Sequence, residues 1–275
     1  MATNLNSVNT NRQALTGLQS LNQANRTLDQ VQNRVSTGRK VIGAADDASS
    51  FSISQNLRGE LGGFQAVSQG IANAQGLSII AQAGAQQVSD LLGDAKAKAI
   101  AGANAANTSE QQAILNQDFQ AITTQINQTI TNSAFNGTNL ISSTSTNVNV
   151  IANTDGSSVA LNATPQVGNA ATAVAGANIS NPANALAAIG QIDQAFSSVG
   201  SALGQLGADF RTLQNQDQFV QQISDQTEIG LGSIVDADLA REAARLSAAQ
   251  ARQGLSTSTL NIANRSPQTL TSLFR

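Results

Sequence analysis

The 275-residue chain contains no cysteine, histidine, tryptophan or tyrosine, and it has only one methionine and three prolines. The absence of cysteine and histidine excludes thiolate and imidazole metal ligands, a cysteine nucleophile and any catalytic triad with a histidine base. Carboxylates remain as catalytic candidates, but the seventeen aspartates and glutamates include only one clustered pair, Asp46–Asp47. Because acidic residues are favourable where a helix begins, we favour a helix-start role for this pair over a metal or acid–base site. We therefore expect neither an enzyme nor a cofactor.

Aromatic residues make up only 3% of the chain, and all eight are phenylalanines. So few large side chains argue against a compact core with aromatic anchors, and favour small residues that let helices approach closely. The formal net charge is −3, although residues 1–40 hold five basic side chains against one acidic, as do residues 239–275. Nucleic-acid binding is the alternative that such basic ends suggest, but aromatic interleaving is missing and the whole chain is acidic. We expect no nucleic-acid partner.

Long hydrophobic runs are also missing. The N-terminus, MATNLNSVNTNRQALTG, lacks the apolar core of a secretory signal peptide, and no stretch approaches the length of a membrane span. We expect no membrane partner, and export of such a chain would require a route that reads something other than a cleavable signal.

Apolar residues recur every seven positions in two long segments, which is the pattern of helices that pack along one seam. The first segment has the a positions Leu57, Phe64, Ile71, Ser78, Ala85, Leu92 and Ala99, with Glu60, Val67, Ala74, Ala81, Val88 and Ala95 at d. The second has Ile189, Phe196, Leu203, Phe210, Asp217, Ser224 and Leu231 at a, with Ile192, Val199, Leu206, Leu213, Val220, Thr227 and Ile234 at d. Each segment spans roughly 65–70 Å as a helix, so the two can pair along their whole length.

These repeats predict a mainly α fold, built as a long antiparallel coiled-coil-like helical bundle. The residues expected to pack between its long helices are Leu57, Phe64, Ile71, Val88, Leu92, Phe196, Leu203, Leu206, Phe210 and Leu213. Several glycines interrupt the first long helix; we favour close helix packing as their reason, with bendability as the alternative.

The segment between the two long helices changes character. Thr108 with Gln111 forms a capping-box pattern that opens a shorter helix. Alternating valines on both sides of a turn at 153–156 then predict one small β-hairpin within 141–164. Residues 165–181 are rich in Ala, Gly, Asn and Pro and are expected to form a loop, before Asn181-Pro182 starts the second long helix.

Both chain ends carry apolar helical stripes without a companion domain. Residues 1–37 are expected to form a helix broken by Gly17, and the last segment is apolar on two faces. The stripe residues singled out are Leu21, Leu28, Val31, Val35, Leu239, Leu246, Leu260, Ile262, Leu270, Leu273 and Phe274. Because isolated amphipathic helices are marginal in water, we hypothesise that both ends are largely unfolded in the monomer and order when subunits stack.

Several sequence blocks, taken in order, resemble bacterial flagellin. The segments Asn33–Val41 (NRVSTGRKV) and Ala45–Ala48 (ADDA) resemble the N-terminal signature of that family, and Phe135–Gly137 resembles its F-N-G element before the hairpin. Ile234–Ala240 and Asn264–Gln268, with the final Leu-Phe-Arg, resemble its closing signature. The resemblance covers roughly residues 1–160 and 182–275.

The resemblance implies a structural subunit that polymerises into the bacterial flagellar filament for swimming motility, located outside the cell. Its terminal helices would pair as a coiled coil in the polymer. The implied partners are further copies of itself or sister flagellins, the type III export apparatus with a flagellar export chaperone, and hook-junction and cap proteins. The implied parts are 1–38 (N-terminal filament-core helix), 39–140 (N-terminal long-helix arm of the rod domain), 141–181 (hairpin and short outer loop), 182–235 (C-terminal long helix of the rod domain) and 236–275 (C-terminal filament-core helix).

The chain departs from the family pattern in two ways. Most members insert outer domains after the hairpin, where this chain has only about residues 165–181. Members that the vertebrate flagellin receptor recognises carry two arginines in a Q-R-V-R-E-L block, which here contains Gln87, Ser89 and Asp90 in the corresponding places. Losing two charge-assisted donors predicts poor receptor activation.

Two alternatives stay open. A hook–filament junction or cap-type protein of the same export family would share the terminal helices, and formation of long filaments by purified protein separates it from a filament subunit. The run Ser142, Ser143, Thr144, Ser145 and Thr146 is a candidate for O-linked glycosylation, whereas the simpler interpretation is a solvated loop.

Overall fold

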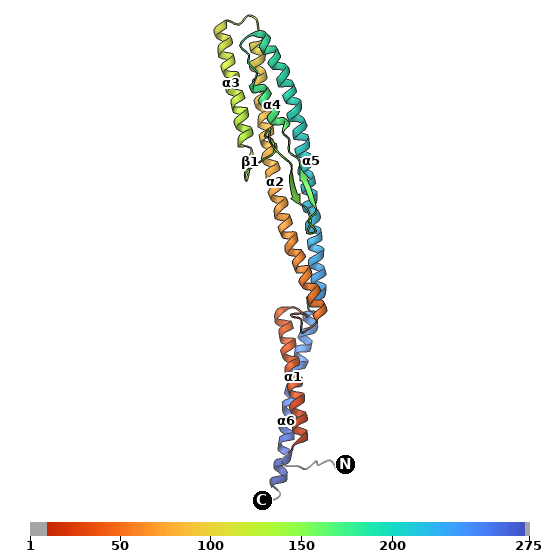
Figure 1. The fold of residues 1–275 in the computed structure, drawn as a ribbon. Coiled ribbons are helices and arrows are strands. Elements are labelled where there is room, and N and C mark those ends of the chain that lie inside the picture. The colour runs from red at the N-terminus through yellow and green to blue at the C-terminus, as the bar shows by residue number, and fades with distance from the viewer. Residues whose placement is uncertain (1–9, 273–275) are drawn as a thin grey trace. The chain divides into compact units, whose positions relative to one another are not determined.

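The computed structural model describes residues 10–272, and the side chains of residues 10–265. Its elements, in chain order, are α1 (Arg12–Thr37), α2 (Ala48–Gly102), α3 (Ser109–Asn132), β1 (Ala134–Phe135), β2 (Thr138–Asn139), β3 (Val148–Ile151), β4 (Ser158–Leu161), α4 (Gln166–Ala175), α5 (Pro182–Val235) and α6 (Leu239–Ser272) (Figure 1). The predicted mainly α class, with long paired helices and a small antiparallel sheet, is confirmed. The chain divides into a terminal unit, Met1–Gly59 with Thr227–Arg275, and a long-helix unit, Glu60–Gln226.

The helix ends follow from local side-chain chemistry. The Asn11 side chain accepts a hydrogen bond from the Ala14 amide (3.0 Å) at the start of α1, and Gly38 ends that helix with φ 68°. The predicted capping box of α3 is confirmed, because Thr108 and Gln111 exchange hydrogen bonds of 2.9 and 3.2 Å. The predicted break at Gly17 is wrong: α1 runs through this residue without interruption.

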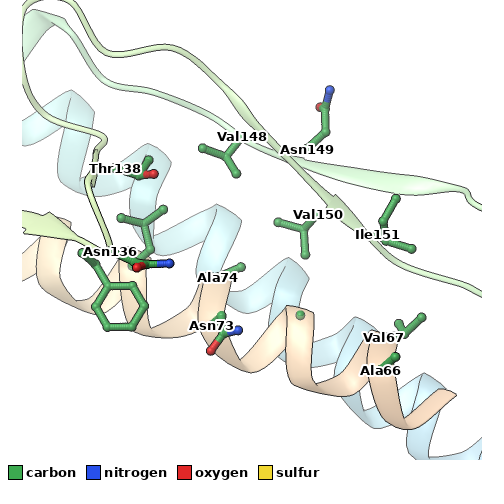
Figure 2. A pocket seen from close by; sticks show the side chains of 13 residues that line it. Ala66, Val67, Asn73, Ala74, Asn136, Thr138, Val148, Asn149, Val150 and Ile151 are labelled. Atoms are coloured by element: carbon green, nitrogen blue, oxygen red, sulfur yellow. The ribbon is translucent and has the colours of Figure 1, made fainter. Parts of the chain in front are cut away.

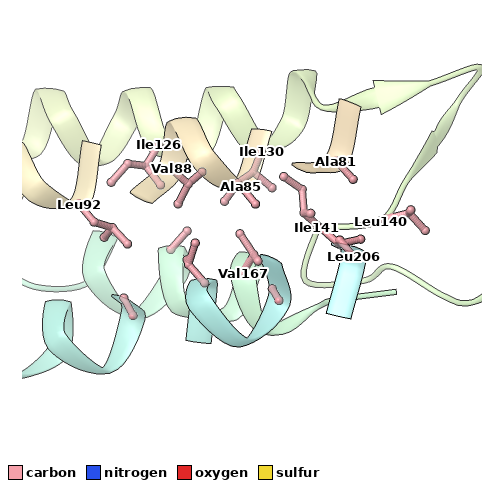
Figure 3. Packing of buried hydrophobic residues seen from close by; sticks show 14 of the residues in the cluster. Ala81, Ala85, Val88, Leu92, Ile126, Ile130, Leu140, Ile141, Val167 and Leu206 are labelled. Atoms are coloured by element: carbon pink, nitrogen blue, oxygen red, sulfur yellow. The ribbon is translucent and has the colours of Figure 1, made fainter. Parts of the chain in front are cut away.

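The first seven-residue seam forms the core of the long-helix unit. From Phe64 to Ala99, every a and d position of α2 is buried, including the polar Ser78, whereas Leu57 is half-buried and Glu60 exposed. The Ser78 hydroxyl donates to the Leu206 carbonyl of α5 at 3.4 Å. This contact and the Lys96–Asp193 ion pair (2.5 Å) show that α2 and α5 run antiparallel. A second buried line on α2, which includes Leu77 and Leu91, belongs to the same core cluster as residues of α3 and α4. Figure 3 shows part of this cluster, with Val88 of α2, Ile126 of α3 and Val167 of α4.

The seam of α5 keeps the predicted d positions, but its a positions are shifted by one residue. The predicted d positions Ile192, Val199, Leu206, Leu213 and Val220 are buried as expected. The predicted a positions, which include Phe196, Leu203 and Phe210, are only half-buried, and the residue before each of several of them is buried instead: Ala188, Ala195, Ala202 and Asp209. Small alanine side chains therefore occupy the closest approach of α5, while the larger side chains cover its flank.

The predicted hairpin is confirmed and is attached to α5. Strands β3 and β4 pair antiparallel, with Val148 opposite Leu161 and Ile151 opposite Ser158. The buried carboxylate of Asp209 accepts hydrogen bonds from the Asn162 amide (2.9 Å) and from the Asn162 side chain (3.1 Å). The Gln216 side chain donates to the Ala152 carbonyl at 2.8 Å. These contacts hold both ends of the hairpin against α5.

Two further elements between α3 and α5 differ from expectation. A second short antiparallel pair, β1 with β2, surrounds the Asn136-Gly137 turn, in which both residues have positive φ. Residues 165–181 are not all loop, because α4 spans Gln166–Ala175. Its residues Val167, Ala171 and Val174, at helical spacing, are all buried, and their burial explains a helix in a segment whose composition is typical of loops.

The glycines of α2 divide into two groups. A Cβ on Gly84 would lie within 3.0 Å of Ser133 and Ile141, and one on Gly63 would collide with Thr154, so close packing explains these positions. A Cβ on Gly59, Gly62, Gly70 or Gly93 would meet nothing within 4 Å. Packing inside the subunit therefore accounts for only part of the glycine content.

Candidate functional site

The terminal unit pairs α1 with α6 through small side chains. The buried residues on α1 are Gly17, Ala24 and Val31, and α6 contributes Ala249 and Ala263. A Cβ built on Gly17 would lie only 3.4 Å from Cδ1 of Leu260, so a larger residue would press on α6 at this point. The two helices therefore approach closely, and little large apolar surface is enclosed between them.

The large aliphatic residues of this pair are only partly covered. Of the stripe residues singled out from the sequence, Val31 is buried, and Leu21, Leu28, Val35, Leu246 and Leu260 are half-buried. Leu239 and Ile262 are 53% and 70% exposed. The Leu270 side chain, and all of Leu273 and Phe274, lie outside the described residues.

Three further leucines of the pair are exposed and were not among the singled-out residues. Leu15 is 55% exposed, Leu18 45% and Leu255 68%. The signal for Leu255 was present in the sequence, because it continues the second apolar face of the last helix together with Ile262. The α1–α6 pair thus presents several large aliphatic side chains on its outside.

A polar cluster lies where α1 ends and α6 begins. The Glu242 side chain is 5% exposed, and its Oε1 lies 2.5 Å from Nη1 of Arg245 and 4.0 Å from Nη1 of Arg34. A cavity of about 420 Å³ adjoins these residues, and Oε2 of Glu242 and Nε of Arg34 are buried without a partner among the described residues. Beside it, the backbone of Arg39 forms a bridge with Asp236.

The clustered acidic pair serves the start of α2. Asp47 accepts hydrogen bonds from the Ser49 and Ser50 amides (3.0 and 3.1 Å) and from the Ser50 hydroxyl (2.7 Å). The hydrogen bond from the Ser50 hydroxyl, followed by that from its amide, lowers the pKa of Asp47. Asp46 accepts from the Ile42 amide at 3.0 Å. Asp47 thus caps the start of α2, as the helix-start interpretation requires, whereas Asp46 stabilises the turn that precedes the helix.

The residues at the place of the receptor block lie on α2. Gln87 and Asp90 are exposed and Ser89 is half-buried, while the intervening Val88 belongs to the core seam. Asp90 accepts a hydrogen bond from the Gln86 side chain at 3.2 Å. This face presents an acidic residue and neutral polar side chains, without the positive charges of recognised family members.

The serine–threonine run is partly accessible. Ser143, Thr144 and Thr146 are exposed, whereas Ser142 and Ser145 are half-buried. A Cβ on Gly168 of α4 would lie 2.2 Å from the Ser143 backbone nitrogen, so α4 packs directly on this segment. Glycosylation of the exposed hydroxyls and a solvated loop are both compatible with this arrangement, and the intact mass of native filament protein separates them.

An apolar groove of about 490 Å³ lies between α2, the β1–β2 turn and β3. In Figure 2, Val150 points from β3 toward α2, where Val67 and Ala74 form part of the floor, and Asn149 points away. Its lining consists of aliphatic residues, Phe135, asparagines and Thr138, without an ionisable side chain. The groove can accept an apolar side chain but has no acid, base or charged group for chemistry.

The described part of the chain lacks the features of two other classes of protein. Among residues 10–272, none of the helices combines the length and apolar character that crossing a membrane requires. Within the same range, no group of three acidic side chains is placed to hold a metal ion.

Comparison with known proteins links both ends of the chain to one family. The model of the bacterial flagellin N-terminal helical region matches residues 8–146, and that of the C-terminal helical region matches residues 189–274. Flagellin FljM of Caulobacter vibrioides is 34% identical over 271 residues, which cover 98% of this chain and 99% of the relative. A flagellin of Brucella melitensis is 31% identical over 281 residues, covering 98% and 99%.

A solved structure described as a putative flagellar hook-associated protein from Vibrio parahaemolyticus shares the fold. It superposes with a TM-score of 0.57 at 16% identity, covering 70% of this chain and 100% of that one. At this identity the likeness concerns the fold alone, whereas the flagellins match along their whole length. The chain therefore belongs to the bacterial flagellin family and is a structural, non-enzymatic subunit of the extracellular flagellar filament.

Proposed function

We propose that this flagellin polymerises by burying the aliphatic side chains left exposed on its α1–α6 pair against the same pair in neighbouring copies. The observation that carries the proposal is the contrast within the terminal unit: its seam is built from Gly and Ala, while Leu15, Leu255 and Ile262 are at least half exposed. Exposed aliphatic side chains gathered on one helix pair are typical of an interaction surface.

Such burial makes a substantial favourable contribution to assembly. Burying one leucine or isoleucine fully is worth about 1.5–3 kcal/mol. Five side chains of the pair are about half exposed or more (Leu15, Leu18, Leu239, Leu255 and Ile262). Because these side chains are already partly covered, completing their burial offers about 4–9 kcal/mol per subunit before the cost of ordering is subtracted. We infer that the terminal segments gain most of their helical order when copies meet.

The remaining assignments follow from family membership. In this proposal residues 1–38 and 236–275 form the filament core, 39–140 and 182–235 form the rod domain, and 141–181 form the outer part. The division of the structure into a terminal and a long-helix unit supports separate roles for the ends and the middle. We also propose the type III export apparatus, an export chaperone, and hook-junction and cap proteins as partners, with sister flagellins as co-subunits.

One substitution tests the assembly proposal. Leu255→Asp should leave the helical signal of the long-helix unit in circular dichroism intact and prevent filament growth on added seeds, because it sets a charge on the exposed aliphatic face. The matched control is Thr257→Asp: Thr257 is also exposed on α6, and its hydroxyl bonds only to its own helix, at the Gln253 carbonyl (2.9 Å). Normal filaments from Leu255→Asp, seen by electron microscopy, would refute the proposal.

Limited proteolysis tests the coupled ordering separately. Both ends should be trimmed rapidly in dilute monomer and resist the protease in filaments. Equal resistance of the ends in the two states would contradict coupled ordering without bearing on which surface is buried.

A further inference from the structure

The seam between α1 and α6 specifies its own alignment poorly. On α1 the buried residues Gly17, Ala24 and Val31 are seven residues apart. On α6 the buried alanines Ala249 and Ala263 are fourteen apart, with the half-buried Ser256 midway between them. In the native pairing Gly17 lies against Leu260. Because both seams repeat every seven residues, sliding one helix by seven places another small residue, Ala24, opposite Leu260 or Leu246. Apolar packing alone therefore distinguishes these alignments weakly.

Three polar contacts between the helices are specific to one alignment. The Asn11 side chain donates to the Ala263 carbonyl (2.7 Å), and the Gln253 side chain donates to Oδ1 of Asn25 (2.8 Å). The third contact is the ion pair of Arg34 with the buried Glu242. Along α1 the contacts follow in the order Asn11, Asn25, Arg34. Their partners on α6 follow in the reverse chain order, Ala263, Gln253, Glu242, as one antiparallel register requires.

A slip of seven residues would break these contacts at a cost. In one direction Asn25 would face Leu260, and in the other it would face Leu246. Glu242, with a side chain only 5% exposed, would keep Arg245 of its own helix at 2.5 Å but lose Arg34 of the facing helix, which lies 4.0 Å away. Removing a partner from a buried polar or charged group is costly, because the group loses water without gaining a replacement. The polar contacts thus penalise the alignments that the small-residue seam tolerates.

We propose that Asn11, Asn25–Gln253 and Arg34–Glu242 form a register lock, which selects one antiparallel alignment of α1 with α6. Polar groups at otherwise apolar helix seams are known to fix register at some cost in stability. The lock concerns the pairing within one chain, and it does not depend on which surfaces of the pair meet neighbouring copies. It would ensure that every subunit enters the filament with its two ends offset by the same number of residues.

The lack of cysteine in the chain allows register to be read by introduced disulfides. A Cβ at Gly17 would lie 3.7 Å from Cβ of Leu260, which matches the spacing of about 3.8 Å in disulfides. The pair Gly17→Cys with Leu260→Cys therefore reports the native register. Ala24→Cys with Leu260→Cys reports a slip of seven residues in one direction, and Ala24→Cys with Leu246→Cys a slip in the other. None of these positions belongs to the lock.

Two of the three contacts of the lock are then removed in each reporter background by combining Asn25→Ala with Glu242→Ala. Variant chains are incorporated as a minor fraction into filaments of unmodified protein, so that assembly does not depend on them, and are oxidised there. We expect the ratio of slipped to native cross-links to rise by about tenfold. The control Arg241→Ala removes an exposed charge from the same turn of α6 and should leave the ratio unchanged.

A position swap distinguishes a lock from simple stabilisation. The double variant Asn25→Gln with Gln253→Asn keeps both amides and their combined length, so its ratio of slipped to native cross-links should equal that of the parent. The double variant Asn25→Ala with Gln253→Ala should have a higher ratio. Unchanged cross-link ratios without the lock residues would overturn the proposal. So would a loss of the native cross-link with no gain in slipped products, since that would show a pair that loosens without changing register. Filament formation itself tests only the assembly proposal.

Discussion

Gly168 gives the sharpest test of how α4 is packed. A Cβ at this position would lie 2.2 Å from the Ser143 backbone nitrogen, 2.7 Å from the Ser142 carbonyl carbon and 2.9 Å from the Ser143 Cα. All three atoms belong to the backbone, so no side chain can rotate away. Gly168→Ala must therefore displace α4 from the 142–143 segment or strain it.

The expected cost is the difference between two effects. Overpacking costs about 1–3 kcal/mol, and the absence of a yielding side chain places this case at the upper end. Replacing glycine by alanine inside a helix returns about 0.5–1 kcal/mol. The net loss is about 2 kcal/mol, which corresponds to a fall in Tm of about 4–8 °C for a unit of this size.

The assay is thermal unfolding of the purified monomer, followed by circular dichroism. Gly204→Ala is the control, because a Cβ at Gly204 on α5 would meet nothing within 4 Å. It should gain about 0.5–1 kcal/mol from helix propensity and raise the Tm by about 1–4 °C. A Gly168→Ala protein as stable as the parent would show that α4 does not lie against this segment and would refute the reasoning.

Two other predictions concern α2. Because hydrogen bonds from Ser50 lower the pKa of Asp47, its contribution to the helix start is present at neutral pH and is lost as the pH falls through that lowered value. The protection factor of the Ser50 amide against hydrogen exchange should fall in that acidic range, and Asp47→Asn should lower it already at neutral pH; an Asp47→Asn protein with the parent's protection factor would contradict the capping role. Purified monomer should activate flagellin-receptor reporter cells poorly, by about a hundredfold relative to members with both arginines, and Gln87→Arg with Ser89→Arg should recover part of the signal; potent signalling by the unmodified protein would refute this.

The sequence predicted those parts of the fold that depend on repeated apolar spacing. The seam of α2 follows its seven-residue pattern because large residues and alanines occupy both of its core positions. In α5 the predicted frame was set by the large residues Phe196 and Leu203, although Ala195 and Ala202 are the residues that are buried. Apolar character alone cannot show that a small residue is preferred where two backbones come near.

The missed helix and the partly predicted site have related causes. Helix α4 is stabilised by burial of Val167 and Val174 against other elements. The local composition of the segment, which is rich in Ala, Gly and Asn, does not indicate a helix. At the chain ends, the apolar stripes were evident from spacing. Which leucines the α1–α6 pair covers depends on its register, and a stripe seen in one helix does not contain that information.

The hydrogen bonds that Asn162 donates to the Asp209 carboxylate bear on how this protein could be engineered. They secure the exit of β4 before α4 begins, and the buried side chains of α4 end at Val174. A foreign peptide spliced in at the exposed Gly176 would lie between the buried Val174 of α4 and the buried Ile179, whose amide donates to Oδ1 of Asn116 at 2.8 Å, so both of its ends would be anchored. The short flagellin is therefore a suitable carrier for displaying a grafted epitope or enzyme tag once on every subunit of a regular array.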